Sequence, residues 1–106
     1  MLTIQCFIKF ANYFDVELKI VSVQKDTYIV NTQDFIDNIN ENTAVIVTIL
    51  GSTYTGHIDD IKKLNDMLVD LKYDIPIHVD AAIGGFIIPF SRPDIIWDFR
   101  LQQVKS

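Results

Sequence analysis

The chain has 106 residues, of which 49% are hydrophobic and 22% charged, and its formal net charge is −5. This composition is that of a globular domain, which excludes a disordered or low-complexity protein. The basic residues are scattered and outnumbered by acidic ones, which argues against a nucleic-acid-binding surface. Cys6 is the only cysteine, so no intrachain disulfide can form. No apolar run reaches the ~20 residues of a membrane span and the start lacks a secretory signal, so we expect a cytoplasmic protein.

The first third of the chain predicts a helix, a strand and a second helix. Apolar residues between positions 2 and 14 recur at spacings of three and four, which favours an amphipathic helix. Val16 to Val23 alternates apolar and polar residues and predicts a half-exposed strand, with a turn at Lys25-Asp26. A short helix capped by Asn31 or Thr32 follows.

The middle of the chain predicts a strand, a helix and another strand. Ala44 to Leu50 is an apolar run rich in β-branched residues, typical of a strand buried on both faces. An apolar stripe from Ile58 to Leu71 predicts the clearest helix. Ile77 to Val79 is a short apolar strand that reaches Asp80, with His78 interpreted as a hydrogen-bonded core residue. The acids of the helical segment are interpreted as its solvated face: Asp59, Asp60, Asp66 and Asp70.

This order of elements predicts an α/β domain with a mostly parallel sheet flanked by helices. No linker divides residues 1–106, which we treat as one unit. Near the end, Pro89 and Pro93 bracket an expected loop, and Ile95-Ile96-Trp97 is a candidate short strand. Trp97 itself is expected to pack in the core or at a subunit interface.

Two polar residues, Thr53 and Asp80, each follow a predicted strand. Ligands of an open parallel sheet bind beyond the carboxyl ends of its strands, so we expect the two residues to share a site. Small residues follow Asp80: Ala82 would leave room for the face of a flat cationic ring, and Gly84-Gly85 would let nearby backbone approach closely. The alternatives are that Asp80 merely caps a following helix, and that Gly51 to Gly56 is an ordinary strand-to-helix turn. Two histidines and one thiol without paired spacing argue against a metal site.

Motifs along nearly the whole chain resemble, in order and spacing, the glutamate decarboxylases, a family of enzymes that depend on pyridoxal 5′-phosphate. The resemblance implies an α/β fold, the large cofactor-binding domain of fold-type-I enzymes, of which residues 1–106 would be a part. It also implies the conversion of L-glutamate to 4-aminobutyrate and carbon dioxide. The matching motifs are Phe7 to Leu18, Glu41-Asn42-Thr43, Thr53-Tyr54-Thr55-Gly56, His78-Val79-Asp80-Ala81-Ala82, Gly84-Gly85-Phe86, Pro89-Phe90, Pro93 to Arg100 and Val104-Lys105-Ser106.

The resemblance gives three residues a role. Asp80 would face the pyridine nitrogen of the cofactor, since a protonated ring draws in the electrons that decarboxylation leaves on the α-carbon. Ala82 would pack against the ring, and Thr53 would offer its hydroxyl to the cofactor or its substrate adduct. The complete enzyme is expected to be a homo-oligomer.

The chain also departs from the family pattern. The family's Schiff-base lysine follows a Ser-x-Ser-x-His approach, and this sequence ends at Ser106 before reaching it. Lys105 precedes that approach in the family pattern and is therefore not the Schiff-base lysine. The segments that hold the cofactor phosphate lie upstream in the family order, and Ile83 stands where the family has a small polar residue. We therefore expect the isolated chain to be inactive.

Two other functions remain open at this point. The chain can be a truncated, non-catalytic product that associates with a related full-length subunit, for which exposed Phe7, Phe10 and Phe14 would provide an interface. It can also be a free-standing nucleotide-binding module. The absence of Gly-x-Gly-x-x-Gly and of a phosphate-binding Gly-x-x-x-x-Gly-Lys loop disfavours that second alternative.

Overall fold

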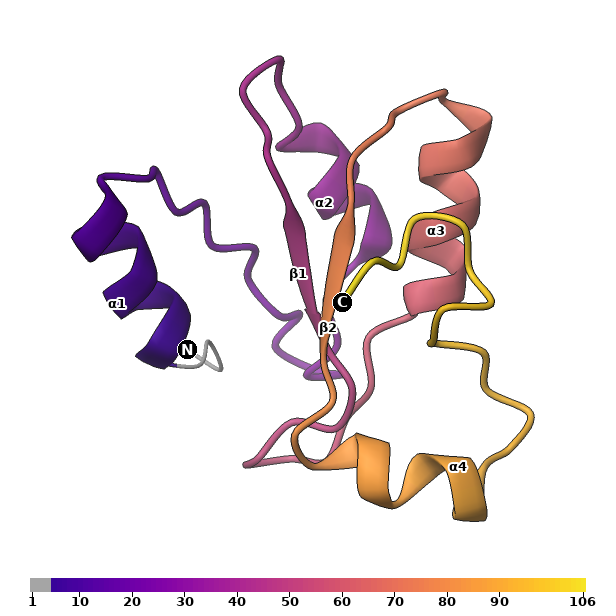
Figure 1. The fold of residues 1–106 in the computed structure, drawn as a ribbon. Coiled ribbons are helices and arrows are strands. Elements are labelled where there is room, and N and C mark those ends of the chain that lie inside the picture. Colours follow the sequence, from indigo (N-terminus) through magenta and orange to yellow (C-terminus); the bar gives the residue numbers. More distant parts are fainter. Residues whose placement is uncertain (1–4) are drawn as a thin grey trace.

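The structure is a computed structural model that describes residues 5–106 (Figure 1). Helix α1 spans Gln5–Phe14, so the predicted first helix is confirmed, and its predicted start at residues 2–4 lies outside the described residues. Figure 1 shows α1 to one side of the sheet, joined to it by an extended segment. Only Ala11 of this helix is buried, whereas Phe10, Tyr13 and Phe14 are exposed. The apolar face of α1 is therefore covered only in part.

The segment from 16 to 23 is extended but forms no strand, so the strand predicted there is wrong. Its only ladder contact is an isolated antiparallel bridge between Val23 and Val30. A strand needs a neighbour for its backbone groups, and within residues 5–106 no strand pairs with positions 16–22. Leu18 and Ile20 are accordingly exposed. Alternation of apolar and polar residues alone supplies no such partner.

The short second helix, α2, spans Thr32–Asp37 as predicted. Asn31 is its N-cap, because the Asn31 side chain accepts a hydrogen bond of 3.2 Å from the backbone N–H of Gln33. Asp34 lies in the first turn, where its negative charge suits the exposed N–H groups.

The sheet consists of two parallel strands, β1 (Ile46–Ile49) and β2 (Ile77–Asp80), paired from Ile46 opposite Ile77 to Ile49 opposite Asp80. Helix α3 (Ile61–Asp70) makes the crossover between them. An isolated parallel bridge joins Ile77 to Val104, so the end of the chain lies along the other edge of β2. These elements confirm the predicted α/β class with parallel strands and flanking helices.

One face of the sheet carries the core. Side chains of β1, β2 and α3 form one buried cluster in which Leu50, Leu68 and Ile77 are fully buried. The prediction that β1 is buried on both faces is wrong, because its residues alternate between buried and half-buried, with Val47 and Ile49 on the less covered face. Helix α3 covers only one side, which explains the difference.

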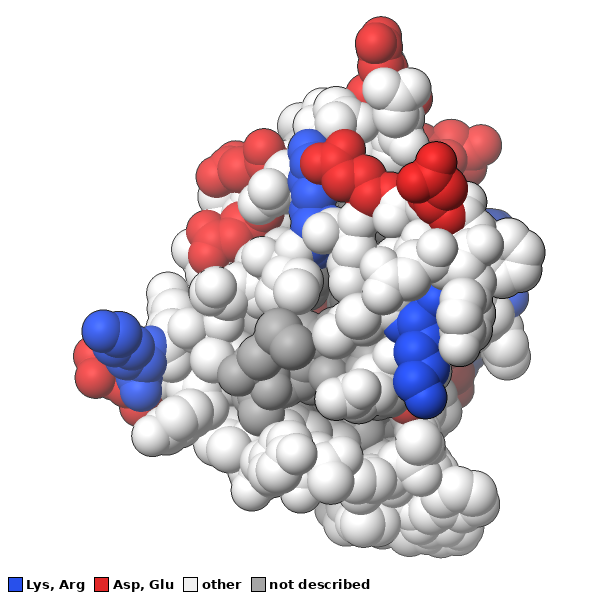
Figure 2. All heavy atoms as spheres, turned by 90° about the vertical axis from the view of Figure 1, so that its left-hand side faces the viewer, with Lys and Arg blue, Asp and Glu red and all other residues white. Residues whose placement is uncertain are grey.

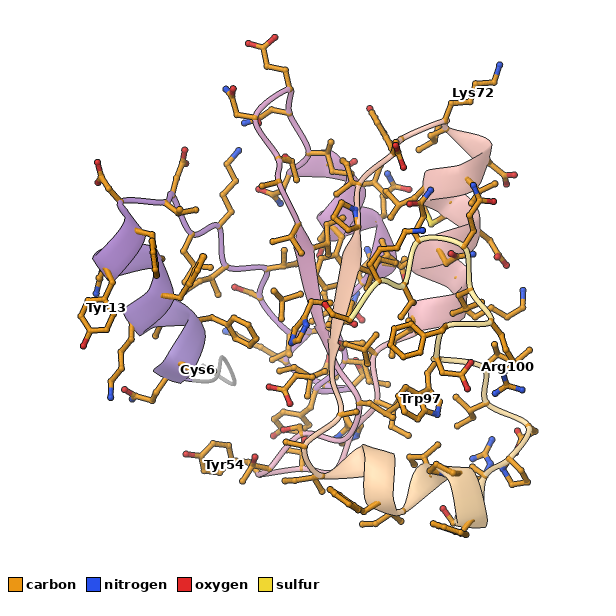
Figure 3. All side chains as sticks on the ribbon, in the orientation of Figure 1. Cys6, Tyr13, Tyr54, Lys72, Trp97 and Arg100 are labelled. Atoms are coloured by element: carbon orange, nitrogen blue, oxygen red, sulfur yellow. The ribbon has the colours of Figure 1, made fainter. Side chains whose placement is uncertain are left out.

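The chain after β2 departs from the sequence predictions. A 3₁₀ turn, η1, spans Gly84–Phe86, and a short helix, α4, spans Ile88–Ser91, where only a loop was expected. Pro89 fits the first turn of α4, because the amide hydrogen that proline lacks has no partner there. Residues 95–97 form no strand; they are half-buried in an irregular segment and pack against the core, as predicted for Trp97 (Figure 3).

Basic side chains do not cluster on the face of the molecule drawn in Figure 2. On the face that Figure 2 shows, the lysine and arginine side chains lie apart from one another and the lower part is uncharged. None of the helices that the structure describes between residues 5 and 106 has the length and apolarity needed to cross a membrane.

Candidate functional site

Thr53 lies on a loop that leaves the carboxyl end of β1 and returns to it. The chain turns at Gly51 and Gly56, whose φ angles of 86° and 70° are in the left-handed region that favours glycine. Leu50 and Ile58 form an antiparallel bridge, and inside it the Ser52 N–H donates to the His57 carbonyl oxygen at 2.9 Å. We call residues 50–59 the Thr53 loop. Thr53 is exposed near its tip, beside the outward-pointing Tyr54 (Figure 3).

Asp80 is the last residue of β2 and lies opposite Ile49, at the start of the Thr53 loop. Its carboxylate Oδ1 accepts a hydrogen bond of 3.1 Å from the Ala82 N–H, and its carbonyl oxygen accepts one of 2.9 Å from the Leu50 N–H. The Asp80 side chain therefore holds the turn that follows it, as the capping alternative expected. No helix begins at Ala81 or Ala82, however, and Ala82 is exposed beside the half-buried carboxylate.

Two glycines bring this turn against the Thr53 loop. The Gly84 N–H donates to the Leu50 carbonyl oxygen at 2.9 Å, and a Cβ on Gly84 would lie 2.1 Å from the same oxygen. A Cβ on Gly51 would lie 3.1 Å from the Gly84 nitrogen. Among the small residues after Asp80, Gly84 is thus required by contact between two backbone segments. The structure brings the loops that carry Thr53, Asp80 and Ala82 together at the carboxyl ends of β1 and β2.

The two histidines occupy different surroundings. His78 is half-buried, so its predicted core position is wrong; it alternates with buried Ile77 and Val79 and therefore points to the opposite face of the sheet. Its Nδ1 lies 2.9 Å from the Ser106 hydroxyl, and the Phe7 ring meets it edge-on. His57 is half-buried in the Thr53 loop, and its Nδ1 is a buried atom without a hydrogen-bond partner among residues 5–106.

Asp59 makes a contact that the sequence interpretation missed. It was assigned to a solvated helix face, but the residue is half-buried, and its Oδ2 accepts a hydrogen bond of 2.8 Å from the Ile49 N–H. Burial raises the pKa of the Asp59 carboxyl, and the hydrogen bond from Ile49 opposes this in part. The sequence did carry a signal for Asp59. Only one of the adjacent acids Asp59 and Asp60 can be the N-cap of α3, and Asp60 has that role, which leaves Asp59 free for another contact.

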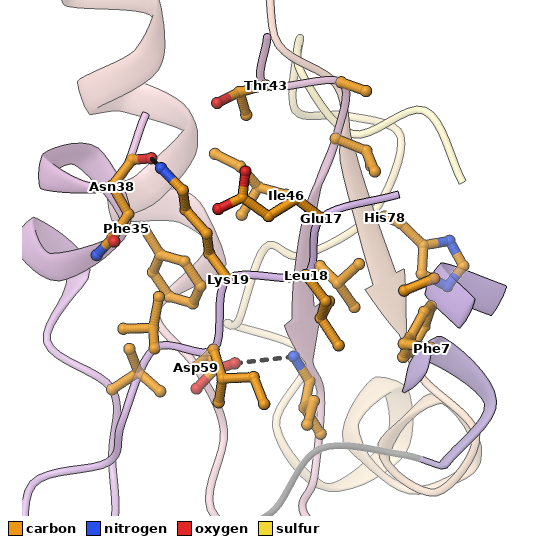
Figure 4. A pocket seen from close by; sticks show the side chains of 18 of the residues that line it. Phe7, Glu17, Leu18, Lys19, Phe35, Asn38, Thr43, Ile46, Asp59 and His78 are labelled. Atoms are coloured by element: carbon orange, nitrogen blue, oxygen red, sulfur yellow. Dashed lines mark hydrogen bonds between the residues drawn. The ribbon is translucent and has the colours of Figure 1, made fainter. Parts of the chain in front are cut away.

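A groove of about 1040 Å³ lies between the extended segment 16–23 and β1 (Figure 4). Most of its lining side chains are apolar, and Asp59 stands in its wall, where the dashed line of Figure 4 marks the bond to Ile49. Thr53, Asp80 and Ala82 do not line this groove. The groove and the predicted site are therefore separate features. Among the residues that the structure describes, no group of three or more His, Cys, Asp or Glu side chains is arranged to hold a metal ion.

Comparison with known proteins gives the family to which this chain belongs. Residues 3–106 match the family model described as the pyridoxal-dependent decarboxylase conserved domain. Because the match spans nearly the whole sequence, the chain belongs to the pyridoxal-dependent decarboxylase family.

Within that family, glutamate decarboxylases are among the relatives that the chain matches. The chain is 51% identical over 105 residues to glutamate decarboxylase 3 of Arabidopsis thaliana, which covers 95% of this chain and 21% of the relative. It is 48% identical to glutamate decarboxylase beta of Listeria innocua, with 95% and 23% covered. The chain thus spans about a fifth of the length of the curated relatives it matches.

Solved structures agree on the fold. The glutamate decarboxylase of Lactobacillus brevis CGMCC 1306 superimposes with a TM-score of 0.89 at 37% identity, over 96% of this chain and 24% of that one. A sphingosine-1-phosphate lyase of Burkholderia pseudomallei K96243 gives a TM-score of 0.84 at 29% identity, over 97% and 24%. The predicted resemblance and the predicted fold class are both confirmed.

Proposed function

We propose that this chain is a segment of a glutamate decarboxylase, a pyridoxal-phosphate-dependent carboxy-lyase that converts L-glutamate to 4-aminobutyrate and carbon dioxide. One observation carries the proposal. Asp80, at the carboxyl end of β2, lies beside the Thr53 loop in a chain whose relatives at about half sequence identity are glutamate decarboxylases. We propose further that the intact protein is a cytoplasmic homo-oligomer.

The residues at this site fit one end of the cofactor. When bound, the cofactor supplies a ring that withdraws electrons from the α-carbon of the substrate. A carboxylate such as that of Asp80, about 4 Å from the ring nitrogen, favours the protonated ring by about 4 kcal/mol at an effective dielectric constant of about 20. Asp80 is only half-buried, and its side chain accepts one hydrogen bond, at Oδ1 from the Ala82 N–H. The carboxylate therefore remains accessible from the site.

Thr53 and Ala82 complete this half of the site. Ala82 is exposed one turn after Asp80, where its methyl group can pack against a ring face without displacing it. Thr53 is exposed near the tip of its loop, where its hydroxyl can donate to an anionic group of the cofactor or the substrate. Thr53 and Ala82 would contact the cofactor or the substrate and orient it, whereas Asp80 would keep a proton on the ring nitrogen.

The isolated chain is proposed to be inactive. Lys105 lies beside the start of β2, since its N–H donates to the Ile77 carbonyl oxygen at 3.1 Å. Asp80 is three residues further along the strand, roughly 10 Å away at ~3.3 Å per residue. This separation supports the family pattern, in which Lys105 is not the Schiff-base lysine.

A non-catalytic chain that associates with a related full-length subunit is the second candidate. It is favoured by the exposed aromatic rings of Phe10 and Phe14, whose centroids lie 4.9 Å apart on α1. Phe7, which was expected to be exposed beside them, is half-buried against His78, so that part of the expectation is wrong. Phe86 and Phe90 are also exposed, at 81% and 85%. Apolar side chains gathered at a surface often mark an interface.

The proposal is tested by sequencing past the Ser106 codon, and by measuring carbon dioxide release from L-glutamate labelled in its α-carboxylate. An open frame that continues into Ser-x-Ser-x-His-Lys, with activity in the intact protein and none in the 106-residue chain, is the expected result. An intact protein that binds pyridoxal 5′-phosphate but leaves glutamate unchanged would contradict the assigned substrate. A stop codon after Ser106 would favour the second candidate.

A further inference from the structure

The Thr53 loop is anchored to β1 through Ile49. Along β1 the backbone N–H groups point alternately to the two edges of the strand. The N–H groups of Ile46 and Leu50 donate to β2 and its approach, at the carbonyl oxygens of Pro76 (3.0 Å) and Asp80 (2.9 Å). The N–H of Ile49 therefore points to the opposite edge, away from β2.

Asp59 satisfies both backbone groups of Ile49 at that edge. Its carboxylate Oδ2 accepts from the Ile49 N–H at 2.8 Å, and its own N–H donates to the Ile49 carbonyl oxygen at 3.1 Å. One residue thus makes the two hydrogen bonds that a neighbouring strand would make. The Asp59 carboxylate stands in for a backbone carbonyl (Figure 4).

These two bonds close the base of the Thr53 loop. Inside the loop the chain bonds to itself, with Ser52 N–H to the His57 oxygen and Gly56 N–H to the Ser52 oxygen. Outside it, the contact of Leu50 with Gly84 fixes one side only. The returning side of the loop is held to the strand by Asp59 and the bridge at Ile58.

We propose that Asp59 is a positioning residue that holds the Thr53 loop against β1 and thereby sets the place of Thr53 relative to Asp80. The inference rests on the proposed function for the role of Thr53, but the contact with Ile49 stands without it. A carboxylate that is partly shielded from water, as in half-buried Asp59, is an unfavourable choice for a purely structural position. Burial raises the pKa of Asp59, which is the physical sign of that unfavourable placement.

The chain offers a matched set of variants. Asp59→Ala removes the acceptor for the Ile49 N–H, whereas Asp59→Asn removes the charge and keeps an acceptor oxygen. Asp60→Asn is the control for the neighbouring charge, because Asp60 is the exposed N-cap of α3, accepts from the Lys63 N–H at 3.0 Å, and asparagine also caps helices well.

The first measurement is hydrogen exchange of the backbone around Ile49 in the cofactor-free intact protein, followed by mass spectrometry. We expect exchange at Ile49 to be about tenfold faster in Asp59→Ala, as expected for the loss of one hydrogen bond, and unchanged in Asp59→Asn and Asp60→Asn. Unchanged exchange in Asp59→Ala would overturn the anchoring contact, whatever reaction the protein catalyses.

The second measurement is a double-mutant cycle with Thr53→Ala on the intact, cofactor-loaded protein, with kcat and KM for glutamate as readouts. If Asp59 acts through Thr53, Asp59→Ala lowers kcat/KM about tenfold in the wild-type background and has little effect in the Thr53→Ala background. Equal losses in both backgrounds would overturn the positioning role. A wild-type protein without glutamate decarboxylation would instead count against the proposed function, and the exchange result would still decide the contact.

Discussion

Gly84 and Leu50 touch through their backbones, with the Gly84 N–H 2.9 Å from the Leu50 carbonyl oxygen. A Cβ on Gly84 would lie 2.1 Å from that oxygen and 2.7 Å from the carbonyl carbon. Because both obstacles are backbone atoms next to the end of β1, they cannot move aside as the end of a long side chain would. This contact joins the turn after Asp80 to the Thr53 loop, so the geometry of the site depends on a residue that carries no side chain.

Gly84→Ala is therefore expected to destabilise the chain by about 3 kcal/mol, at the upper end of the range for overpacking a tight site. Urea unfolding measures the loss. Gly85→Ala is the matched control, because its Cβ would meet no backbone atom within 4 Å but only two side-chain atoms, the Ala81 Cβ at 3.1 Å and Trp97 at 3.9 Å, so that a shift of a few tenths of an ångström relieves the contact. Equal losses for the two variants would show that the two loops do not meet as described.

Leu68→Ala tests whether the core sits between α3 and the sheet. Leu68 is fully buried on α3, so its truncation is expected to lower the free energy of unfolding by about 2–5 kcal/mol. Leu71, just after the same helix, is 52% exposed, and Leu71→Ala is expected to change it by about 0.5 kcal/mol or less. Urea unfolding of both variants, compared at equal slope, checks the contrast.

The elements with strong local signals were predictable from the sequence. The apolar stripe of α3 and the cap at Asn31 act within a few residues, so they are fixed by nearby sequence. The strands β1 and β2 were also found, because an apolar run between turn residues has few other solutions. The strand predicted for residues 16–23 was wrong for the opposite reason. A strand needs a neighbouring strand, and the residues of this segment do not specify one.

The site was predictable in outline and not in detail. Thr53 and Asp80 were brought together by the rule for parallel strands, which depends only on the order of the elements. Asp59 was missed because a buried acid and a solvated one look alike in a helical pattern. Its role depends on the path of the Thr53 loop back to Ile49, a contact across ten positions that no periodicity reveals.

Asn65 makes a contact that holds the end of the chain. This buried side chain on α3 accepts a hydrogen bond of 2.9 Å at Oδ1 from the Gln103 N–H, in a buried setting. Asn65→Ala leaves that N–H without a partner, so we expect a loss of about 1–3 kcal/mol and faster hydrogen exchange at Gln103. Lys63→Ala, at an exposed position of the same helix, is the control and should leave exchange at Gln103 unchanged.

Asp80→Ala tests the assigned role of the site in the intact protein. If Asp80 keeps the cofactor ring protonated, we expect kcat to fall by about a thousandfold, the factor that corresponds to ~4 kcal/mol. The subunit should still fold, because Asp80 is only half-buried and its side chain makes one local hydrogen bond to Ala82. Circular dichroism and thermal unfolding confirm the fold, and activity within a fewfold of wild type would remove Asp80 from this role.

Asp59 should make stability depend on pH in the direction opposite to most acids. Burial raises its pKa in the folded chain above the ordinary value that it has when unfolded, so between the two values the folded chain binds more protons. Stability contributed by Asp59 is then fully present below the unfolded pKa and is lost as pH rises through the folded pKa. We therefore expect Asp59→Asn to gain stability relative to wild type as the pH rises from the unfolded to the folded pKa of Asp59. The difference in unfolding free energy, Asp59→Asn minus wild type, should increase over this pH range.

Asp66 provides the control of opposite sign. The hydrogen bond from Lys62 lowers the pKa of Asp66, so its contribution is present above the unfolded pKa and is lost as pH falls through the folded one. The unfolding free energy of Asp66→Asn minus that of wild type should therefore decrease as pH rises. Urea unfolding of the three proteins from acid to neutral pH measures both differences. Because Asp66 is exposed and Asp59 is not, added salt should shrink the first difference more than the second. Slopes of the same sign would mean that burial does not raise the pKa of Asp59 in the folded chain.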